Sequence, residues 1–589
     1  VSGAKEVFFA IVSTSIILIS VFIPIAFLQG DTAKLFDELA VTIIGAIFFS
    51  TIISLTLTPM LCSQILSVKK KFVSKNLFQE IYEKNIMNII SKKKLIFVSI
   101  LFLVITSIFL FKNISRELAP KEDRGAFFMV LNGPEGSSYK NTVQQMLNLE
   151  EKLLEFNKNN EANRILLRVP RSFSGAENFS DGIGIIVLNH WNERRSIWEI
   201  ISEIRSKTLN ISDARIQIFP PRGLGQRRSG SQLQLVLGGD SYEEIDIVMS
   251  ELVQKIKEND SFVFVDTDYK KNRPQLKVFI DRKKSSELEV STSQVGRTLE
   301  VLLGGRKVNT FIDKGEEYYI MMQSISSERK LPNDLRQIMV RSSNGELIRL
   351  DSLIYTEENS AAKELNRYNR IRAITLKASL KKDYSLGEAI QFIEKSLQEK
   401  NTENIKIDYK GQSKEYKDSS KQMFYLFIIS LLVVYLVLSA QFESFVTPLI
   451  IMVSVPLSIS GGIFGLWLFE SSLNIFSQIG IIILIGISAK NGILIVEFAN
   501  QLREKGENIS SSIYYSCKKR FRPIIMTGFS TIVGAIPLVV GSGAGSESRQ
   551  TIGIVIIFGI LFSIFLTLIV TPFFYKLIAP YSKQKFFEQ

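Results

Sequence analysis

The sequence predicts an α-helical membrane domain joined to a large α+β domain outside the membrane. Three observations support this fold class. The mean hydropathy of the 589 residues is +0.16 although 22% of them are charged, so apolar and charged residues must be segregated along the chain. Eight stretches are apolar enough to cross a hydrocarbon layer of about 30 Å, which needs about 20 helical residues. A charged block, residues 112–422, separates the third stretch from the fourth.

The eight apolar stretches are predicted to be transmembrane helices. Any one of them could be a buried helix of a soluble core, but eight together are typical of a membrane protein. The third is short, and its flanking lysines can extend it by reaching toward the membrane surface. The stretches are Val7–Leu28, Val41–Leu66, Leu95–Phe111, Met423–Ala440, Phe445–Phe469, Ile475–Ala499, Pro523–Val540 and Ile552–Tyr575.

Basic residues gather in alternate loops between these stretches. Cytoplasmic loops of membrane proteins carry an excess of lysine and arginine, so the basic loops are predicted to be cytoplasmic. The block 112–422 then lies outside the cytoplasm, and the net charge of +13 reflects topology rather than nucleic-acid binding. The basic residues are Lys69, Lys70, Lys71, Lys75, Lys84, Lys92, Lys93 and Lys94 after the second stretch, and Arg503, Lys505, Lys518, Lys519, Arg520 and Arg522 after the sixth.

Several classes of site are excluded by composition. The chain has two cysteines, Cys62 and Cys517, too few for a disulfide scaffold or a four-thiolate zinc site. The single histidine, His190, makes a histidine-based metal or catalytic centre improbable and is interpreted as a surface or core residue. No GxxxxGK[ST] loop occurs, so no ATP site of that kind is expected. From composition we therefore expect no metal, no cofactor and no enzymatic centre.

The first two apolar stretches resemble the last two. Pro24 and Pro59 are 35 residues apart, and so are Pro537 and Pro572, in matching positions of the two pairs. Such spacing indicates a parallel internal repeat of the kind found in some transporters. A helix and a large external block precede the last pair but not the first. The chain, which begins at Val1, is therefore expected to be the C-terminal half of a twelve-span protein.

The charged block contains repeated strand–turn–helix patterns. Strands are predicted at Ala126–Leu131, Gln232–Leu237 and Arg372–Ala378, each followed by a turn and an amphipathic helix, and a further strand at Ile405–Tyr409. Strands with helices on one face indicate ferredoxin-like α+β units. Residues 275–305 are interpreted as an insertion with its own strand and helix.

Polar residues inside the apolar stretches are the candidate functional groups. Lys490 lies about 22 Å from the outer end and about 13 Å from the cytoplasmic end of its helix, at 1.5 Å per residue. A charge at that depth is costly unless it meets a polar partner, which makes Lys490 a functional candidate; the alternative is that its amine reaches the cytoplasmic surface. No carboxylate lies deep in the eight stretches, so its partner is expected in a missing half. Arg520 and Thr527 are seven residues apart on one helix face, where Thr527 could instead serve helix packing.

The segments GISAKNGILIVEFANQLREKG (486–506) and RFRPIIMT (520–527) resemble the resistance-nodulation-division (RND) efflux pumps, in their hydrophobe/amphiphile multidrug branch. This resemblance implies a homotrimer of twelve-helix protomers in the inner membrane of a Gram-negative bacterium. It implies exchange of protons for small amphiphilic drugs, driven by the proton motive force. A periplasmic adaptor and an outer-membrane channel are the implied partners.

The resemblance also implies site residues and domains. Lys490 would pair with two aspartates of the fourth family helix, and Arg520 and Thr527 would complete the proton relay. Ser172, Phe173, Ser174 and Gly175 match the switch loop of the drug pathway, and Ile185 stands where a pocket aromatic is common. The implied domains are family helices 5–7 (1–114), a first porter subdomain (115–228), a second one in two parts (229–270 and 363–421), a docking subdomain (271–362) and helices 8–12 (422–589).

Two alternatives remain open at this stage. An RND exporter of another cargo, a lipid or a metal ion, would share the same membrane helices. Metal export would favour methionine or acidic pairs within the membrane, and the eight stretches contain no such pair. A non-transporting membrane accessory or receptor is the other alternative. It would bind a ligand without pH-driven flux.

Overall fold

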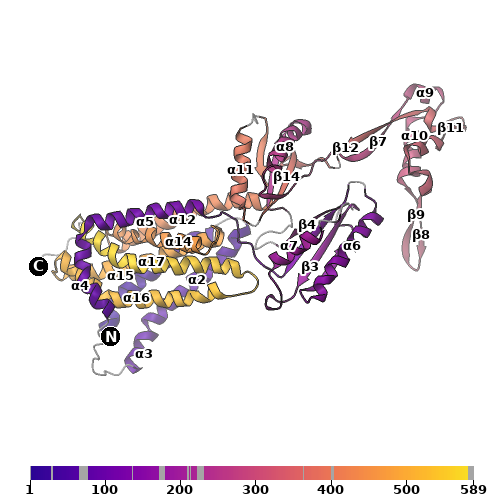
Figure 1. The fold of residues 1–589 in the computed structure, drawn as a ribbon. Coiled ribbons are helices and arrows are strands. Elements are labelled where there is room, and N and C mark those ends of the chain that lie inside the picture. The colour runs from indigo at the N-terminus through magenta and orange to yellow at the C-terminus, as the bar shows by residue number, and fades with distance from the viewer. Residues whose placement is uncertain are drawn as a thin grey trace. The chain divides into compact units, whose positions relative to one another are not determined.

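A computed structural model describes residues 2–27, 31–65, 77–134, 137–171, 179–208, 211, 214–221, 231–362, 364–381, 383–399 and 404–581. Figure 1 labels the helices and strands along the chain. The chain forms two compact units. The first contains 1–132, 139–267 and 367–589, and the second contains 133–138 and 268–366.

All eight predicted spans are helical. Seven helices are long and apolar enough to cross a membrane, whereas the first predicted span contributes only a shorter apolar helix, Ile11–Ala26, within the described residues. The number eight therefore stays a prediction. The fifth span is interrupted at Val453 and is built from two helices. The bounds are α1 Ser2–Phe22, η1 Ile23–Phe27, α2 Asp31–Leu55, α3 Leu57–Ile65, α5 Lys93–Asn113, α12 Gly411–Gln441, α13 Thr447–Met452, α14 Ser454–Leu468, α15 Ile475–Glu504, α16 Ile509–Val540, α17 Ser546–Ile578 and η7 Ala579–Tyr581.

The helices α14, α15 and α17 pack closely because glycines let their backbones approach. A Cβ atom added at Gly461 of α14 would lie 2.5 Å from the carbonyl oxygen of Phe558 on α17. A Cβ atom at Gly559 of α17 would lie 2.2 Å from a methyl group of Leu484 on α15. Both distances are too short for an alanine. The close packing of these three helices therefore requires glycine, which has no side chain, at both positions. Most of α15 is buried within it.

The basic loop after the second span contains a helix that the sequence analysis missed, α4 (Leu77–Ser91). Its buried face carries Ile86 and Ile90, and the ring of Tyr82 stacks on Phe521 of α16 at a centroid distance of 4.6 Å. The Tyr82 hydroxyl donates a hydrogen bond of 2.8 Å to the carbonyl oxygen of Leu568 in α17. The sequence signal for this helix is a set of apolar or aromatic residues at four-residue spacing, in a loop that is otherwise rich in lysine.

The first sheet has the strand order β2-β3-β1-β4, with every neighbouring pair antiparallel. The element order is strand, helix, strand, strand, helix, strand, that of a split βαβ unit. One sheet face packs on the two helices, through Phe127 and Met129 on the strand side and Leu149 and Ile200 on the helix side. The elements are β1 Ala126–Asn132, α6 Tyr139–Lys158, β2 Ala162–Arg168, β3 Asp181–Leu188, η2 Trp191–Glu193, α7 Ile197–Thr208 and β4 Arg215–Phe219.

The second sheet repeats this arrangement. Its strand order is β6-β14-β5-β15, and the short β13 extends the edge of β14. Ser385 caps α11 in a capping box with Glu388. The elements are β5 Leu233–Gly239, α8 Tyr242–Lys257, β6 Phe262–Thr267, β13 Arg367–Tyr368, β14 Ile371–Leu380, α11 Leu386–Gln398 and β15 Lys406–Tyr409.

The second unit is inserted between β6 and β14. The Asn366 side-chain amide donates a hydrogen bond of 3.1 Å to Asp268, so the first and last residues of the long segment meet. Strand β7 pairs with β12, and a small core gathers Val295, Val340 and Leu353. The elements are β7 Arg273–Ile280, α9 Arg282–Glu287, α10 Thr292–Leu299, a π-helical turn Glu300–Gly304, β8 Arg306–Asp313, β9 Glu316–Met322, η4 Ser326–Glu328, η5 Pro332–Gln337, β10 Met339–Arg341, β11 Leu347–Arg349, η6 Leu350–Ser352 and β12 Ile354–Ala361. The predicted domain boundaries stay predictions.

Candidate functional site

Lys490 lies at the middle of α15, on a helix whose neighbouring positions are buried. Ser488, Ala489 and Asn491 are buried, while the Lys490 side chain is half-buried. The Ser488 hydroxyl is satisfied locally by donating 2.7 Å to the Leu484 carbonyl oxygen. Within the described residues, the Lys490 amine makes no hydrogen bond or ion pair. The structure therefore places a positive charge inside the helix bundle without a partner in the described part of the chain.

Arg520 contacts the same helix closer to its C-terminal end. Its guanidinium lies 5.0 Å from the centre of the Phe498 ring on α15, and the Lys519 amine lies 5.0 Å from that ring as well. Cations are attracted to the face of an aromatic ring at such distances. Phe498 is eight residues beyond Lys490, a rise of about 12 Å along a helix. Arg520 is thus beside α15 but two turns away from Lys490.

Thr527 does not approach Lys490 in the described structure. Its side chain is exposed on α16, and its hydroxyl donates 3.2 Å to the carbonyl oxygen of Ile524 in the same helix. The structure therefore brings Arg520, but not Thr527, against α15. The assignment of Lys490, Arg520 and Thr527 to a proton relay stays a prediction.

Polar contacts between helices hold the C-terminal half of α15, and the sequence analysis did not find them. The Tyr575 hydroxyl of α17 donates a 2.5 Å hydrogen bond to the side-chain oxygen of Asn500. The Ser516 hydroxyl of α16 donates 2.7 Å to the carbonyl oxygen of Ile495. The only signal in the sequence was a polar residue at an otherwise apolar helix position. These bonds fix α15 to α16 and to α17 on the C-terminal side of Lys490.

The predicted drug pathway is only partly described. Ser172, Phe173, Ser174 and Gly175 lie outside the described residues. Ile185 lies in the middle of β3, directly opposite Phe128 of β1 and Leu166 of β2. These residues share the sheet face that points away from α6 and α7, since the alternate residues face the helices.

An aromatic pair extends this apolar face. Phe128 is also opposite Phe219 of β4, with ring centroids 5.9 Å apart. Sequence reasoning named only Ile185 here, because the partners of a strand residue depend on strand order and register. The open face of the first sheet is therefore lined by apolar side chains from all four strands.

The segment between α5 and β1, residues 114–125, is bonded to the start of α15. The Leu473 N–H donates 2.8 Å to the carbonyl oxygen of Ser115, and the Glu117 N–H donates 3.1 Å back to that of Leu473. The Ile475 N–H, at the first residue of α15, donates 3.2 Å to the carbonyl oxygen of Leu118. We call residues 114–125 the linker. It forms a short parallel bridge with the segment that leads into the helix of Lys490.

Two acidic residues of the linker join it to α17 and to the first sheet. The buried carboxylate of Glu122 accepts a hydrogen bond from the hydroxyl of Ser548, in the first turn of α17. Asp123 accepts hydrogen bonds of 2.7 and 2.9 Å from the Arg194 guanidinium, and one of 3.1 Å from the N–H of Ile197. Burial acts to raise the pKa of Asp123, but these hydrogen bonds outweigh it and lower that pKa below its ordinary value.

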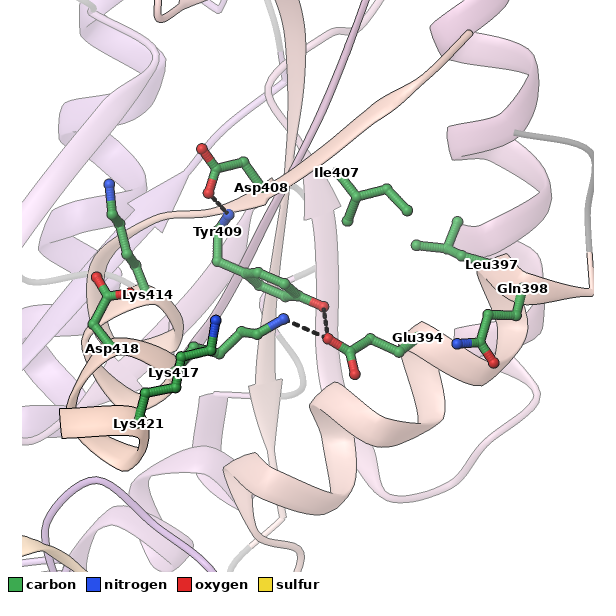
Figure 2. A pocket seen from close by; sticks show the side chains of 10 residues that line it. All are labelled: Glu394, Leu397, Gln398, Ile407, Asp408, Tyr409, Lys414, Lys417, Asp418 and Lys421. Carbon is green, nitrogen blue, oxygen red and sulfur yellow. Dashed lines mark hydrogen bonds and ion pairs between the residues drawn. The ribbon is translucent and has the colours of Figure 1, made fainter. Parts of the chain in front are cut away.

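A charged pocket of about 560 Å³ lies where α11, β15 and the start of α12 meet, and Figure 2 shows its lining. The Lys417 amine lies 2.6 Å from a Glu394 carboxylate oxygen, and the Tyr409 hydroxyl donates 3.3 Å to the same oxygen. Burial and the nearby Glu394 carboxylate raise the pKa of Tyr409. Three lysines from α12 face three carboxylates, so the pocket is balanced in charge. The charged lining residues are Lys414, Lys417 and Lys421, and Glu394, Asp408 and Asp418.

The sequence of residues 1–579 matches the AcrB/AcrD/AcrF family. The chain belongs to this family. The match covers nearly all of the chain, and it confirms the resemblance to RND efflux pumps drawn from the segments around Lys490 and Arg520. Together with the seven apolar helices, it makes the chain part of a multi-pass membrane protein.

Curated relatives of this AcrB/AcrD/AcrF family member are transporters. It is 27% identical over 594 residues to an uncharacterized transporter of Haemophilus influenzae, covering 98% of this chain and 57% of the relative. It is 29% identical over 586 residues to the multidrug/solvent efflux pump membrane transporter MepB of Pseudomonas putida, covering 96% and 56%. It is 26% identical over 588 residues to the multidrug resistance protein MdtC of Photorhabdus laumondii, covering 97% and 56%. These names agree with a transporter rather than an enzyme.

The chain spans a little over half the length of the curated relatives that it matches. The expectation that it is a C-terminal half is nevertheless not confirmed, because the family match extends over the whole of residues 1–579. The internal proline spacing that suggested this division does not show which part of a longer relative is matched.

Proposed function

We propose that this chain works in a proton-driven efflux transporter that exports drugs or other small amphiphilic compounds. The observation that carries the proposal is the AcrB/AcrD/AcrF family match over residues 1–579, within which Lys490 stands in the middle of α15. Curated relatives are named as multidrug and solvent efflux pumps. The energy source is the proton motive force, and no metal or cofactor is required.

Lys490 is the residue proposed to couple protons to movement. A lysine amine inside a membrane helix costs several kcal/mol unless an acidic or polar group meets it, so it is retained where it has a function. Protonation of acidic partners would neutralise them and release the amine, which changes the forces on α15. Arg520, beside Phe498 on the same helix, and Thr527 complete the proposed relay.

The linker offers a physical route from α15 to the sheets. A displacement at the start of α15 acts on the backbone bonds to Ser115 and Leu118. The same linker holds Arg194 through Asp123, and Arg194 belongs to the first sheet unit. Helix movement would therefore change the position of the first sheet, whose open face carries Phe128, Ile185 and Phe219. An apolar, aromatic face suits amphiphilic compounds.

The assembly proposed for the transporter follows the family. It is a homotrimer in the inner membrane of a Gram-negative bacterium, with the two sheets as periplasmic porter subdomains. The second unit, residues 268–366, would dock toward an outer-membrane channel with the help of a periplasmic adaptor.

The test is a comparison of Lys490→Ala with Lys505→Ala in the assembled transporter. Lys505 is exposed just after α15. Its replacement removes the same single positive charge as Lys490→Ala, but outside the helix bundle. The variants are reconstituted in liposomes, and efflux of a fluorescent amphiphile is measured under an imposed pH gradient. We expect Lys490→Ala to lose pH-driven efflux with trimer formation unchanged, and Lys505→Ala to behave as the wild type. Efflux retained by Lys490→Ala would refute the coupling role, and amphiphile binding without flux in the wild type would favour a receptor.

A further inference from the structure

Three consecutive lysines lie where α4 meets α5. Helix α4 ends at Ser91 and α5 begins at Lys93, with Lys92 between them in a non-helical conformation (φ −82°, ψ 65°). The two helices remain in contact across this bend. Because Lys92 interrupts the helix, the three side chains are not spaced around a continuous helical surface. They gather at one end of a membrane helix.

A groove of about 680 Å³ opens at this bend. It is lined by Ser91, Lys92, Lys93, Lys94, Leu95 and Val98. The lining contains no carboxylate, and within the described part of the chain the three lysine amines make no ion pair. Glu83 of α4 is engaged elsewhere, with its carboxylate 2.8 Å from the amine of Lys518 on α16. The groove therefore has a positive charge that no described residue neutralises.

This groove differs from the charged pocket of Figure 2. There, three carboxylates lie in the same lining as the three lysines of α12, and Lys417 forms an ion pair with Glu394. The pocket of Figure 2 is thus neutral within itself and needs no ligand for charge balance. At the α4–α5 bend, three lysines line the groove with no carboxylate among the lining residues, and an anion would neutralise their charge.

An apolar track on α5 begins at the edge of the groove. Five residues on one helix face are between 57% and 71% exposed, at the three- and four-residue spacing of a single stripe. They are Leu95, Val98, Phe102, Ile105 and Phe109. The first two also line the groove, so the track continues from the lysines along the membrane-spanning length of α5.

We propose that the groove between α4 and α5 binds the phosphate headgroup of an anionic phospholipid, whose acyl chain lies along the apolar track of α5. The lysine amines pair with the phosphate oxygens, and the hydrocarbon covers Leu95, Val98 and Phe102. The positive charge of the groove favours an anionic headgroup. The apolar track favours a lipid over a soluble phosphate, because only a lipid has an acyl chain that covers the track. The inference rests on the proposed function only in placing this end of α5 at a membrane surface.

A bound lipid would act on α4 and α16. Helix α4 is held to α16 by the Tyr82–Phe521 stack and the Glu83–Lys518 ion pair, and it ends at the groove. A headgroup bound at the bend would fix the angle between α4 and α5. It would thereby stabilise the packing of α4 against α16, the helix of Arg520.

The experiment measures lipid retention in the assembled transporter. The transporter is purified from nanodiscs of phosphatidylcholine that contain phosphatidylglycerol as the anionic probe, and retained lipids are counted by native mass spectrometry. The test variant is K92Q/K93Q/K94Q. The matched control is K283Q/K314Q/K330Q, which removes the same charge from exposed lysines of the second unit. A third variant, K92R/K93R/K94R, keeps the charge.

We expect the test variant to retain about tenfold less phosphatidylglycerol than the wild type, because several amines bind one headgroup. The control and the arginine variant should retain it as the wild type does. Equal retention by the wild type and the test variant would overturn the proposal, as would an equal loss in the control. Displacement of the lipid by millimolar glycerol phosphate would show a soluble-phosphate site instead. The readout requires no transport, so a failure of the efflux proposal would leave it unaffected.

Discussion

The carboxylate of Asp123 accepts two hydrogen bonds from the guanidinium of Arg194, at 2.7 and 2.9 Å. The Arg194 side chain is only 1% exposed, so the pair is almost removed from water on the arginine side. The N–H groups of Gly125 and Ile197 donate to the same carboxylate. The last residues of the linker are therefore fixed to the loop before α7.

Replacing Asp123 with asparagine should destabilise the first sheet. The change leaves the buried Arg194 charge without its partner, which costs about 3 kcal/mol. Thermal unfolding of the purified transporter, followed by intrinsic fluorescence, measures the effect. Asp260→Asn, at an exposed turn, is the control and should unfold as the wild type does. Equal melting temperatures for both variants would contradict a structural role for the pair.

The same pair should make stability depend on pH. The folded-state pKa of Asp123 is lowered, so its contribution is fully present above the unfolded pKa of about 3.9 and is lost as the pH falls through the folded pKa. The wild type should therefore lose more stability than Asp123→Asn between about pH 4 and the lower folded pKa. Melting temperatures recorded across this range test it, and parallel pH profiles for the two proteins would show that another group dominates.

Ser548→Ala should weaken the joint between α17 and the linker. The buried Glu122 carboxylate would lose a hydroxyl donor, at a cost of about 1–3 kcal/mol. A double-mutant cycle with Glu122→Gln isolates the interaction, since the second change should cost less once Ser548 is gone. Strictly additive losses in unfolding free energy would mean that the two residues do not interact.

Gly461→Ala should disturb the packing of α14 on α17. The new methyl group would lie 2.5 Å from the Phe558 carbonyl oxygen, so a helix must move, at a cost of about 1–3 kcal/mol. Gly534→Ala on α16 is the matched control, because a Cβ atom there meets nothing within 4 Å. Thermal unfolding in detergent compares the two variants. A control that loses as much stability as Gly461→Ala would contradict the packing effect, because helix propensity alone favours alanine over glycine.

Tyr82→Phe and Tyr82→Ala should separate two parts of the docking of α4. The phenylalanine variant removes the hydroxyl, with its hydrogen bond to the Leu568 carbonyl oxygen, worth about 1 kcal/mol, and its contact with the Cys517 thiol, and it keeps the stack on Phe521. The alanine variant removes both. Hydrogen–deuterium exchange of residues 77–91 should rise slightly in the first and strongly in the second. The same increase in both would show that the ring contributes nothing to docking.

Much of the fold follows from the sequence because membrane helices and sheet strands have strong patterns. A segment in lipid must satisfy its backbone hydrogen bonds internally, so the long apolar stretch around Lys490 was expected to be a helix. The alternating stretches Gln232–Leu237 and Arg372–Ala378 were recognised as strands because successive side chains of a strand point to opposite faces, and both form strands, β5 and β14. Helix α4 was missed because its apolar face has only three or four residues, and the lysines on either side of it indicated a loop.

The candidate site was less predictable than the fold. Hydropathy identified Lys490 without any knowledge of its surroundings, because a charge in an apolar helix is rare. Thr527 was placed with Arg520 by spacing alone, yet its side chain is exposed on α16. Asn500 with Tyr575, and Glu122 with Ser548, join residues 75 and 426 positions apart. Contacts of that range depend on how helices pack, which no local pattern records.

The hydrogen bond between Asp268 and Asn366 brings together the entry and exit of the inserted unit. The chain leaves the second sheet after β6 and returns to pair β14 beside it, so the sheet keeps its order whatever the insertion contains. The unit is thus a replaceable module. Its sequence can therefore change, or be exchanged for that of a relative, without altering the strand order of the sheet that carries it.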